Sequence, residues 1–212
     1  MRIGLYGGSF DPIHYGHLRP VREALEVLEL DRVEYLPTAR PPHKRRDMAP
    51  PEARYAMVEM ALLKEPRCYA SAFEMRSTAA YTVDTLRHFR RRQPQAELFL
   101  LVGGDSFAAL PSWKEWRRIL ETAQIGILER PGSAVAAAGP DAVELAPELR
   151  AALAEGRAHR VGNLPVDVSS TEVRRAVASG AASLAGLVPE LVLDYIEKYR
   201  LYRGRSAPPS PT

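Results

Sequence analysis

Two histidines three residues apart, His14 and His17, lie in the string GGSFDPIHYGH near the start of the chain. Imidazole nitrogens donate hydrogen bonds and gain charge near neutral pH, so two that face one ligand suit phosphate groups. Gly16 between them lets a phosphate or nucleobase approach the backbone, and Gly7 with Gly8 permits a tight turn close to a triphosphate. The alternative is a glycine turn with two incidental histidines. The complete string favours nucleotide binding.

A second polar string, SSTEVR, begins at Ser169. Ser169 with Glu172 three residues later forms a capping box, which would explain the string in isolation. The hydroxyls and N–H groups of such a helix start, with Arg174 one turn further on, also suit a phosphate cradle. The two interpretations are compatible, and the pairing of this string with the first one favours phosphate binding.

Both strings must be positioned by strands and helices that alternate along the chain. Apolar runs predict strands at residues 3–6, 33–36, 68–73, 98–102, 125–128 and 166–168. Helical periodicity and capping signals predict helices from about 17, over 52–63, after 82, over 170–180 and over 189–199. This alternation predicts an α/β fold, a Rossmann-like, doubly wound parallel sheet with helices on both faces. Ligands bind at the carboxyl ends of the strands in such sheets, where the first string lies.

Composition sets the broad class. The chain has 212 residues with 46% hydrophobic and 26% charged residues, which are ordinary globular proportions. The net charge of +3 is smaller than the excess of basic residues expected of a nucleic-acid-binding protein. The single cysteine, Cys68, suits a reducing compartment. No uncharged run reaches the roughly 18 residues of a membrane span. We expect one cytoplasmic domain over 1–202, a disordered tail over 203–212, and no nucleic-acid or membrane partner.

The two strings resemble the HxGH and SSTxxR motifs of the nucleotidyltransferase superfamily. Further strings narrow the resemblance to bacterial nicotinate-nucleotide adenylyltransferases: PPHK, YTVDTL, GGDSFAALPSW, ERPG and YIEKYRLY, in that order. The resemblance spans residues 3–202. Ser9 stands where the family usually has Thr, Gly104 stands where Ala is common, and residues 78–80 depart from the family's Gly-Pro-Ser.

The resemblance implies transfer of AMP from ATP to nicotinate mononucleotide, which yields nicotinate adenine dinucleotide and pyrophosphate in NAD biosynthesis. It implies Mg²⁺ bound through the ATP phosphates, catalytic phosphate contacts from His14, His17 and Arg174, and a ribose contact from Asp105. The ATP-binding residues that it implies are Gly7, Gly8, Ser9, Phe10, His14, His17, Gly103, Asp105, Ser169, Ser170, Thr171 and Arg174. The residues that it implies for the acceptor are Ser9, His43, Lys44, Tyr81, Thr82 and Trp113.

Residue chemistry fits this reaction. The attacking phosphate of the acceptor is already anionic at pH 7, so positioning and charge stabilisation replace a general base. Trp113 offers a flat face for a pyridine ring, and the helix start at Thr82 suits the carboxylate of nicotinate. The alternatives are that Trp113 and Trp116 are core residues at helical spacing and that Thr82 is an N-cap.

Rival functions are a phosphopantetheine adenylyltransferase-like enzyme, a less favoured cytidylyltransferase, and a non-catalytic nucleotide-binding or nucleic-acid-binding module. Trp113 and the pair Tyr81 and Thr82 speak against the first. The basic residues are scattered over several segments, which argues against the nucleic-acid-binding module. The run of arginines from 87 to 92 is interpreted as a solvated face. Residues 131–158 are interpreted as a variable excursion, and a homo-oligomer is compatible with the sequence, which leaves the oligomeric state open.

Overall fold

The computed structural model describes residues 1–39, 48–76, 81–129, 144–162, 166, 168–180 and 183–203. Three sequence expectations therefore fall outside the described residues. These are the acceptor roles of His43 and Lys44, the effect of the departure at 78–80, and the disordered tail beyond Arg203.

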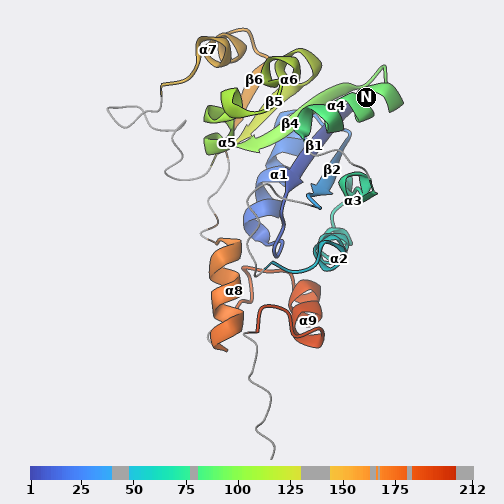
Figure 1. Cartoon of the computed structure of the whole chain (residues 1–212), viewed down its shortest axis with the longest axis vertical. Helices are drawn as coiled ribbons and strands as arrows, with labels where there is room; N and C mark the ends of the chain where they lie inside the picture. Colours follow the sequence, from blue (N-terminus) through green and yellow to red (C-terminus); the bar gives the residue numbers. More distant parts are fainter. Residues whose placement is uncertain are drawn as a thin grey trace, which may run out of the picture.

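Six parallel strands form one sheet in the order β3-β2-β1-β4-β5-β6 (Figure 1). They are β1 (Arg2–Gly8), β2 (Arg32–Pro37), β3 (Cys68–Ala70), β4 (Glu97–Gly103), β5 (Gln124–Leu128) and β6 (Ala158–Val161). The strand order reverses between β1 and β4, which pair in register with Leu5 opposite Leu100. The predicted doubly wound sheet is confirmed, and its ligand crevice is expected where this order reverses.

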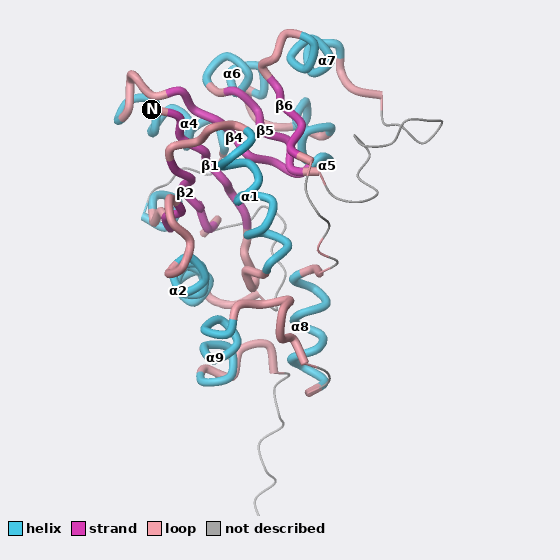
Figure 2. The backbone as a smooth tube through the Cα atoms, turned by 180° about the vertical axis from the view of Figure 1, so that it is seen from behind, coloured by secondary structure: helices cyan, strands magenta, loops and turns pink. Residues whose placement is uncertain are grey.

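Helices cover both faces of the sheet. They are α1 (Tyr15–Val27), α2 (Pro51–Leu62), α3 (Phe73–Arg76), α4 (Thr82–Arg92), α5 (Gly104–Ala108), α6 (Trp116–Thr122), α7 (Pro147–Ala154), α8 (Ser170–Ser179) and α9 (Glu190–Lys198), with a 3-10 turn at Leu110–Ser112. Figure 2 shows α1 crossing one face of the sheet, and α8 with α9 beyond one end of it. The helix predicted over 170–180 ends as expected, because Gly180 takes the left-handed conformation there.

Side chains alternate along β4 between two apolar cores. Phe99 and Leu101 join the core formed with α1, α2 and α9, whereas Leu98, Leu100 and Val102 join the core formed with α4, α6 and α7. A strand that is buried on both faces in this way reads as the unbroken apolar run seen in the sequence. Because the first core also includes residues of α8 and α9, the C-terminal helices are held against the start of the chain.

Two predicted strands are wrong, one in its position and the other in its length. Residues 166 and 168 are not in a strand. Among the described residues the last strand is β6, whose four residues Ala158–Val161 include two polar side chains that hid its pattern. The strand predicted over 68–73 ends at Ala70, because Phe73 begins α3. The apolar residue that seemed to prolong the strand is instead packed against the second core.

Candidate active site

The turn that leaves β1 is not made by its glycines. Gly7 and Gly8 are the last residues of the strand, and the left-handed residue is Phe10, with a φ of 46°. A Cβ on Gly8 would lie 2.9 Å from Cζ of Phe10, so this glycine makes room for the phenyl ring. The predicted glycine turn is therefore wrong in its mechanism, although the chain does turn here toward α1.

The two histidines lie together at the start of α1. His14 is the N-cap and only 2% exposed, and its ring centroid lies 3.8 Å from that of His17. The His14 backbone N–H donates to Nδ1 of His17 at 3.3 Å, which places the proton of a neutral His17 on Nε2. A Cβ on Gly16 would lie 2.9 Å from Nδ1 of His14, so the glycine between the histidines admits the His14 ring.

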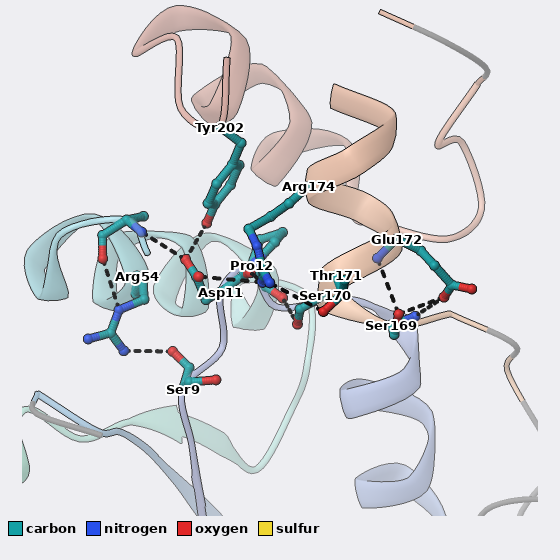
Figure 3. A network of polar contacts seen from close by, with 11 residues as sticks. Ser9, Asp11, Pro12, Arg54, Ser169, Ser170, Thr171, Glu172, Arg174 and Tyr202 are labelled. Carbon is teal, nitrogen blue, oxygen red and sulfur yellow. Dashed lines mark hydrogen bonds and ion pairs between the residues drawn. The ribbon is translucent and has the colours of Figure 1, made fainter. Parts of the chain in front are cut away.

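The structure brings the two polar strings into direct contact (Figure 3). The Ser170 hydroxyl donates to the Pro12 carbonyl at 3.0 Å. Nη1 of Arg174 donates to the Asp11 carbonyl at 2.7 Å, and its Nη2 donates to the Thr171 hydroxyl at 3.2 Å. Residues some 160 positions apart in sequence thus build one polar surface beside the histidines.

The start of α8 is a complete capping box, as the sequence predicts. The Ser169 hydroxyl accepts from the Glu172 backbone N–H at 3.2 Å, and the Glu172 carboxylate accepts from the Ser169 backbone N–H at 2.8 Å. The Ser169 hydroxyl also donates to the Glu172 carboxylate at 2.7 Å. This bond and the one from the Ser169 backbone N–H lower the pKa of Glu172, since they favour its charged form. The cap is therefore satisfied by the protein itself.

Sequence reasoning missed a buried arginine below this surface. Arg54 is 1% exposed and donates to the backbone carbonyls of Ser9 at 2.6 Å, Thr38 at 2.8 Å and Ala49 at 3.2 Å. Its pKa is lowered by burial, a change that the nearby charge of Asp11 opposes. It thereby joins the segments that follow β1 and β2 to the segment that precedes α2. Its spacing from the apolar residues of α2 places Arg54 on the buried face of that helix, and this signal in the sequence was missed.

Asp11 and Tyr202 complete the network, and neither was singled out in the sequence. The Asp11 carboxylate, 2% exposed, accepts through Oδ1 from the Ala49 backbone N–H at 3.0 Å and the Tyr202 hydroxyl at 2.8 Å. Its Oδ2 lies 3.5 Å from Nη1 of Arg174. Both residues stood inside quoted motifs, GGSFDPIHYGH and YIEKYRLY, whose spacing did not reveal that they meet.

A cavity of about 560 Å³ opens beside this network, at the carboxyl ends of β1 and β4. Five predicted site residues line it: Gly7, Gly8, Tyr81, Thr82 and Trp113. Polar residues that sequence reasoning missed also line it: Thr38, Glu74, Thr85, Ser106 and Lys114. The cavity therefore gathers the predicted acceptor residues that the structure describes, apart from Ser9.

The start of α4 faces this cavity without a cap from its own side chain. Tyr81 is the N-cap and makes no side-chain cap hydrogen bond, so the alternative that Thr82 is the N-cap is wrong. Trp113 follows the 3-10 turn and Trp116 begins α6, so they do not share one helix. Both tryptophans are half-buried against the second core, but only Trp113 lines the cavity.

One carboxyl group stands in the cavity wall. Glu74 accepts a hydrogen bond from the Thr85 hydroxyl at 3.0 Å, and burial raises the pKa of Glu74. Across the opening, Nζ of Lys114 lies 4.3 Å from the centroid of the Tyr81 ring. The cavity wall thus carries one acidic and one basic group among neutral hydroxyls and apolar side chains.

Gly103 and Asp105 lie at the same edge of the sheet. Gly103 ends β4, the strand beside β1, and Asp105 is an exposed residue of the short helix α5. Ser9 is likewise exposed, with its carbonyl held by Arg54. These residues therefore lie at or just after the carboxyl ends of two adjacent strands, β1 and β4.

The arginine run on α4 is only partly a solvated face. Arg90 donates to the carbonyls of Ala96 at 2.6 Å and Thr122 at 2.8 Å, which ties α4 to neighbouring loops. Arg87 pairs with Glu115 of the segment before α6. Among these arginines, the predicted exposure holds for Arg91 and Arg92.

Comparisons with known proteins show the family of this chain and a matching fold. A family model described as cytidylyltransferase-like matches residues 5–176. A probable nicotinate-nucleotide adenylyltransferase of Thermus thermophilus is 45% identical over 205 residues, covering 96% of this chain and 100% of that protein. Another from Geobacter metallireducens is 41% identical over 215 residues, covering 95% and 98%. A solved Plasmodium falciparum nicotinic acid mononucleotide adenylyltransferase complexed with NaAD has a similar fold, with a TM-score of 0.73 at 19% identity, covering 95% and 97%.

No helix in the described part of the chain has the length and apolar character needed to cross a lipid bilayer.

Proposed function

Because this chain belongs to the nicotinate-nucleotide adenylyltransferase family, we infer that it transfers the adenylyl group of ATP to nicotinate mononucleotide. An oxygen of the acceptor's 5′-phosphate attacks the α-phosphorus of ATP. The bond from that phosphorus to the β-phosphate bridging oxygen breaks, and pyrophosphate leaves with its electron pair. Nicotinate adenine dinucleotide is the other product. The attacking oxygen is already anionic at neutral pH, so the reaction needs no general base.

We propose that the donor nucleotide occupies the surface where the two polar strings meet. Nε2 of His17 donates a hydrogen bond to a phosphate oxygen, since its Nδ1 is held by the His14 backbone. Arg174 adds a fixed positive charge and a planar set of donors. These groups stabilise the charge that develops on the phosphates in the transition state. Asp105 and Gly103, at the end of β4, are assigned to the adenosine.

The expected Mg²⁺ is assigned to the phosphate oxygens of ATP. The donor surface presents imidazole, guanidinium and hydroxyl groups, which bind phosphates, while the Asp11 carboxylate is already held by Ala49, Tyr202 and Arg174. Among the described residues, no group of three or more His, Cys, Asp or Glu side chains is arranged to hold a metal ion. When bound, Mg²⁺ neutralises part of the charge on the phosphates.

We assign the acceptor to the cavity beside α4. Trp113 supplies a flat face for the pyridine ring, and the uncapped start of α4 at Thr82 supplies N–H groups for its carboxylate. His43 and Lys44 are assigned to the acceptor phosphate on the family resemblance alone. The buried Cys68 supports the expectation of a reducing, cytoplasmic compartment.

The observation that carries this function is the contact between the two polar strings, together with a cavity lined by Gly7 and Gly8 of the first string and by Thr82 and Trp113. The test mixes the purified protein with Mg-ATP and, separately, with nicotinate mononucleotide, nicotinamide mononucleotide and phosphopantetheine. Pyrophosphate release should be fastest with nicotinate mononucleotide. Release with phosphopantetheine alone, or no release with any acceptor, would contradict the proposal.

A further inference from the structure

The two oxygens of the Asp11 carboxylate have unequal surroundings. Oδ1 accepts two hydrogen bonds, from the Ala49 backbone N–H and the Tyr202 hydroxyl. Oδ2 is buried, accepts no hydrogen bond from the described residues, and lies 3.5 Å from Nη1 of Arg174. That distance is longer than the 2.7–2.9 Å of a charge-assisted hydrogen bond. The ion pair between Asp11 and Arg174 is therefore incomplete.

Arg174 keeps its guanidinium oriented by other contacts. Nη1 donates at 2.7 Å to the carbonyl of Asp11 rather than to its carboxylate, and Nη2 donates to Thr171. A guanidinium has five N–H donors in a fixed plane, so these contacts leave the edge that carries Nε and one N–H of Nη2 for a phosphate. If the Asp11 carboxylate moved closer, it would rotate the guanidinium of Arg174 away from the phosphate and neutralise its positive charge.

The chain bends sharply to deliver Tyr202 to Asp11. After α9, Arg200 and Tyr202 both have left-handed backbone conformations, with φ of 52° and 63°. Non-glycine residues adopt this conformation at a cost in free energy and keep it where surrounding contacts require it. Burial raises the pKa of Tyr202 far above its ordinary value, and the charge of Asp11 adds to this effect. The phenol therefore stays protonated and donates to the carboxylate.

We propose that Tyr202 is a positioning residue for adenylyl transfer, whose hydroxyl holds the Asp11 carboxylate back from Arg174 and so keeps the guanidinium free to bind ATP phosphate. This inference rests on the proposed function. Without the hydroxyl, Oδ1 retains only the Ala49 N–H, and a buried carboxylate that loses a donor moves toward the nearest positive charge. Arg174 then pairs with Asp11 and binds phosphate more weakly.

The test compares Tyr202→Phe with a matched control, Tyr199→Phe. Tyr199 lies three residues earlier, is 55% exposed, and is outside the network, so its hydroxyl should not affect catalysis. Tyr202→Phe should lower kcat/KM for ATP by about tenfold, the size expected for one lost hydrogen bond to a charged group. The KM for nicotinate mononucleotide should change less than twofold. Equal kinetics in the two variants, or equal losses for both substrates, would overturn the proposal.

A double-mutant cycle with Arg174→Lys shows whether Tyr202 acts through Arg174. If it does, the double variant should lose much less than the product of the two single losses, because the second change removes an interaction that is already broken. Multiplicative losses, which would mean that the two side chains act independently, would overturn the proposal. A wild-type protein that forms no dinucleotide would instead reject the proposed function, so the two failures are distinguishable.

Discussion

Two helix starts face the proposed substrates, and they are built differently. At α8, the Ser169 hydroxyl accepts from the Glu172 N–H at 3.2 Å, so the helix is capped by its own residues. At α4, the N-cap Tyr81 makes no side-chain cap hydrogen bond, and the adjoining Thr82 lines the cavity. The first helix start has a side-chain cap from its own residues, whereas the second has no side-chain cap and adjoins the cavity.

This difference separates the two kinds of recognition. At the donor end, the Glu172 N–H of α8 is already held by the Ser169 hydroxyl, so we assign phosphate binding chiefly to the side chains of His14, His17 and Arg174. At the acceptor end, the first turn of α4 has no side-chain cap, so its N–H groups are suited to bind a carboxylate directly. We expect changes at the donor end to lower turnover, and changes at the acceptor end to alter the choice of substrate.

The largest effect is expected at the donor end. His17→Ala removes the Nε2 donor and should lower kcat by roughly two or more orders of magnitude, the size found for groups that stabilise transition-state charge. The melting temperature should change little. Steady-state kinetics with His88→Ala as control provide the measurement, because His88 stacks on Phe73 outside the cavity. Near-normal turnover of His17→Ala would refute the phosphate role.

A second test addresses the acceptor end. Nicotinate and nicotinamide mononucleotide differ only in the ring substituent, so a carboxylate that gains one or two charge-assisted hydrogen bonds should be preferred about tenfold to several hundredfold. Thr82→Val should reduce this preference, because it replaces a hydroxyl that lines the cavity beside the N–H groups of the first turn of α4 with a methyl group. The measurement is kcat/KM for both acceptors. Equal wild-type values would reject the preference while leaving adenylyl transfer intact.

The ring site is tested separately from the substituent. Trp113→Ala should raise the KM for both acceptors by roughly tenfold, since stacking and burial do not sense the substituent. Trp116→Ala is the matched control, because this tryptophan is half-buried but lies outside the cavity. An unchanged KM in Trp113→Ala would move the ring site elsewhere.

The sequence predicted five of the six described strands and the starts of α2, α4, α8 and α9, because these depend on local patterns, whereas it did not predict β6, α3, α5 or α6. Periodicity located α4 and α8, and the Ser169 and Glu172 spacing alone predicted the capping box. The contacts of Arg54 and Tyr202 could not be predicted, because they join segments far apart in the chain to backbone carbonyls or to a single carboxylate. Gly16 was interpreted as room for a phosphate or nucleobase to approach the backbone, but the structure shows a packing reason, the close approach of the His14 ring.

A smaller loss is expected when the shape of one cation changes at the donor end. Arg174→Lys keeps the charge but replaces a planar fork with a point charge, so it cannot contact Asp11, Thr171 and phosphate together. We expect kcat/KM for ATP to fall severalfold to about tenfold, and further in Arg174→Ala. Arg175→Lys, on the exposed side of the same turn, is the control. ATP kinetics equal to wild type in Arg174→Lys would make Arg174 an ordinary surface residue.

The smallest effect is expected at the cap of α8, and it should appear in stability rather than in catalysis. Hydrogen bonds from Ser169 lower the pKa of Glu172 in the folded protein. The stabilisation from its charge is therefore complete above the unfolded pKa of about 4.3 and disappears as the pH falls through the lower, folded pKa. Glu172→Gln should lower the melting temperature by about 1 to 2 °C at pH 7, and by nothing measurable near pH 2. Its KM for ATP should stay within twofold of wild type, because a helix start closed by its own cap does not depend on the ligand. A tenfold change in that KM would show instead that the α8 start opens to bind phosphate, and the contrast with α4 would fail.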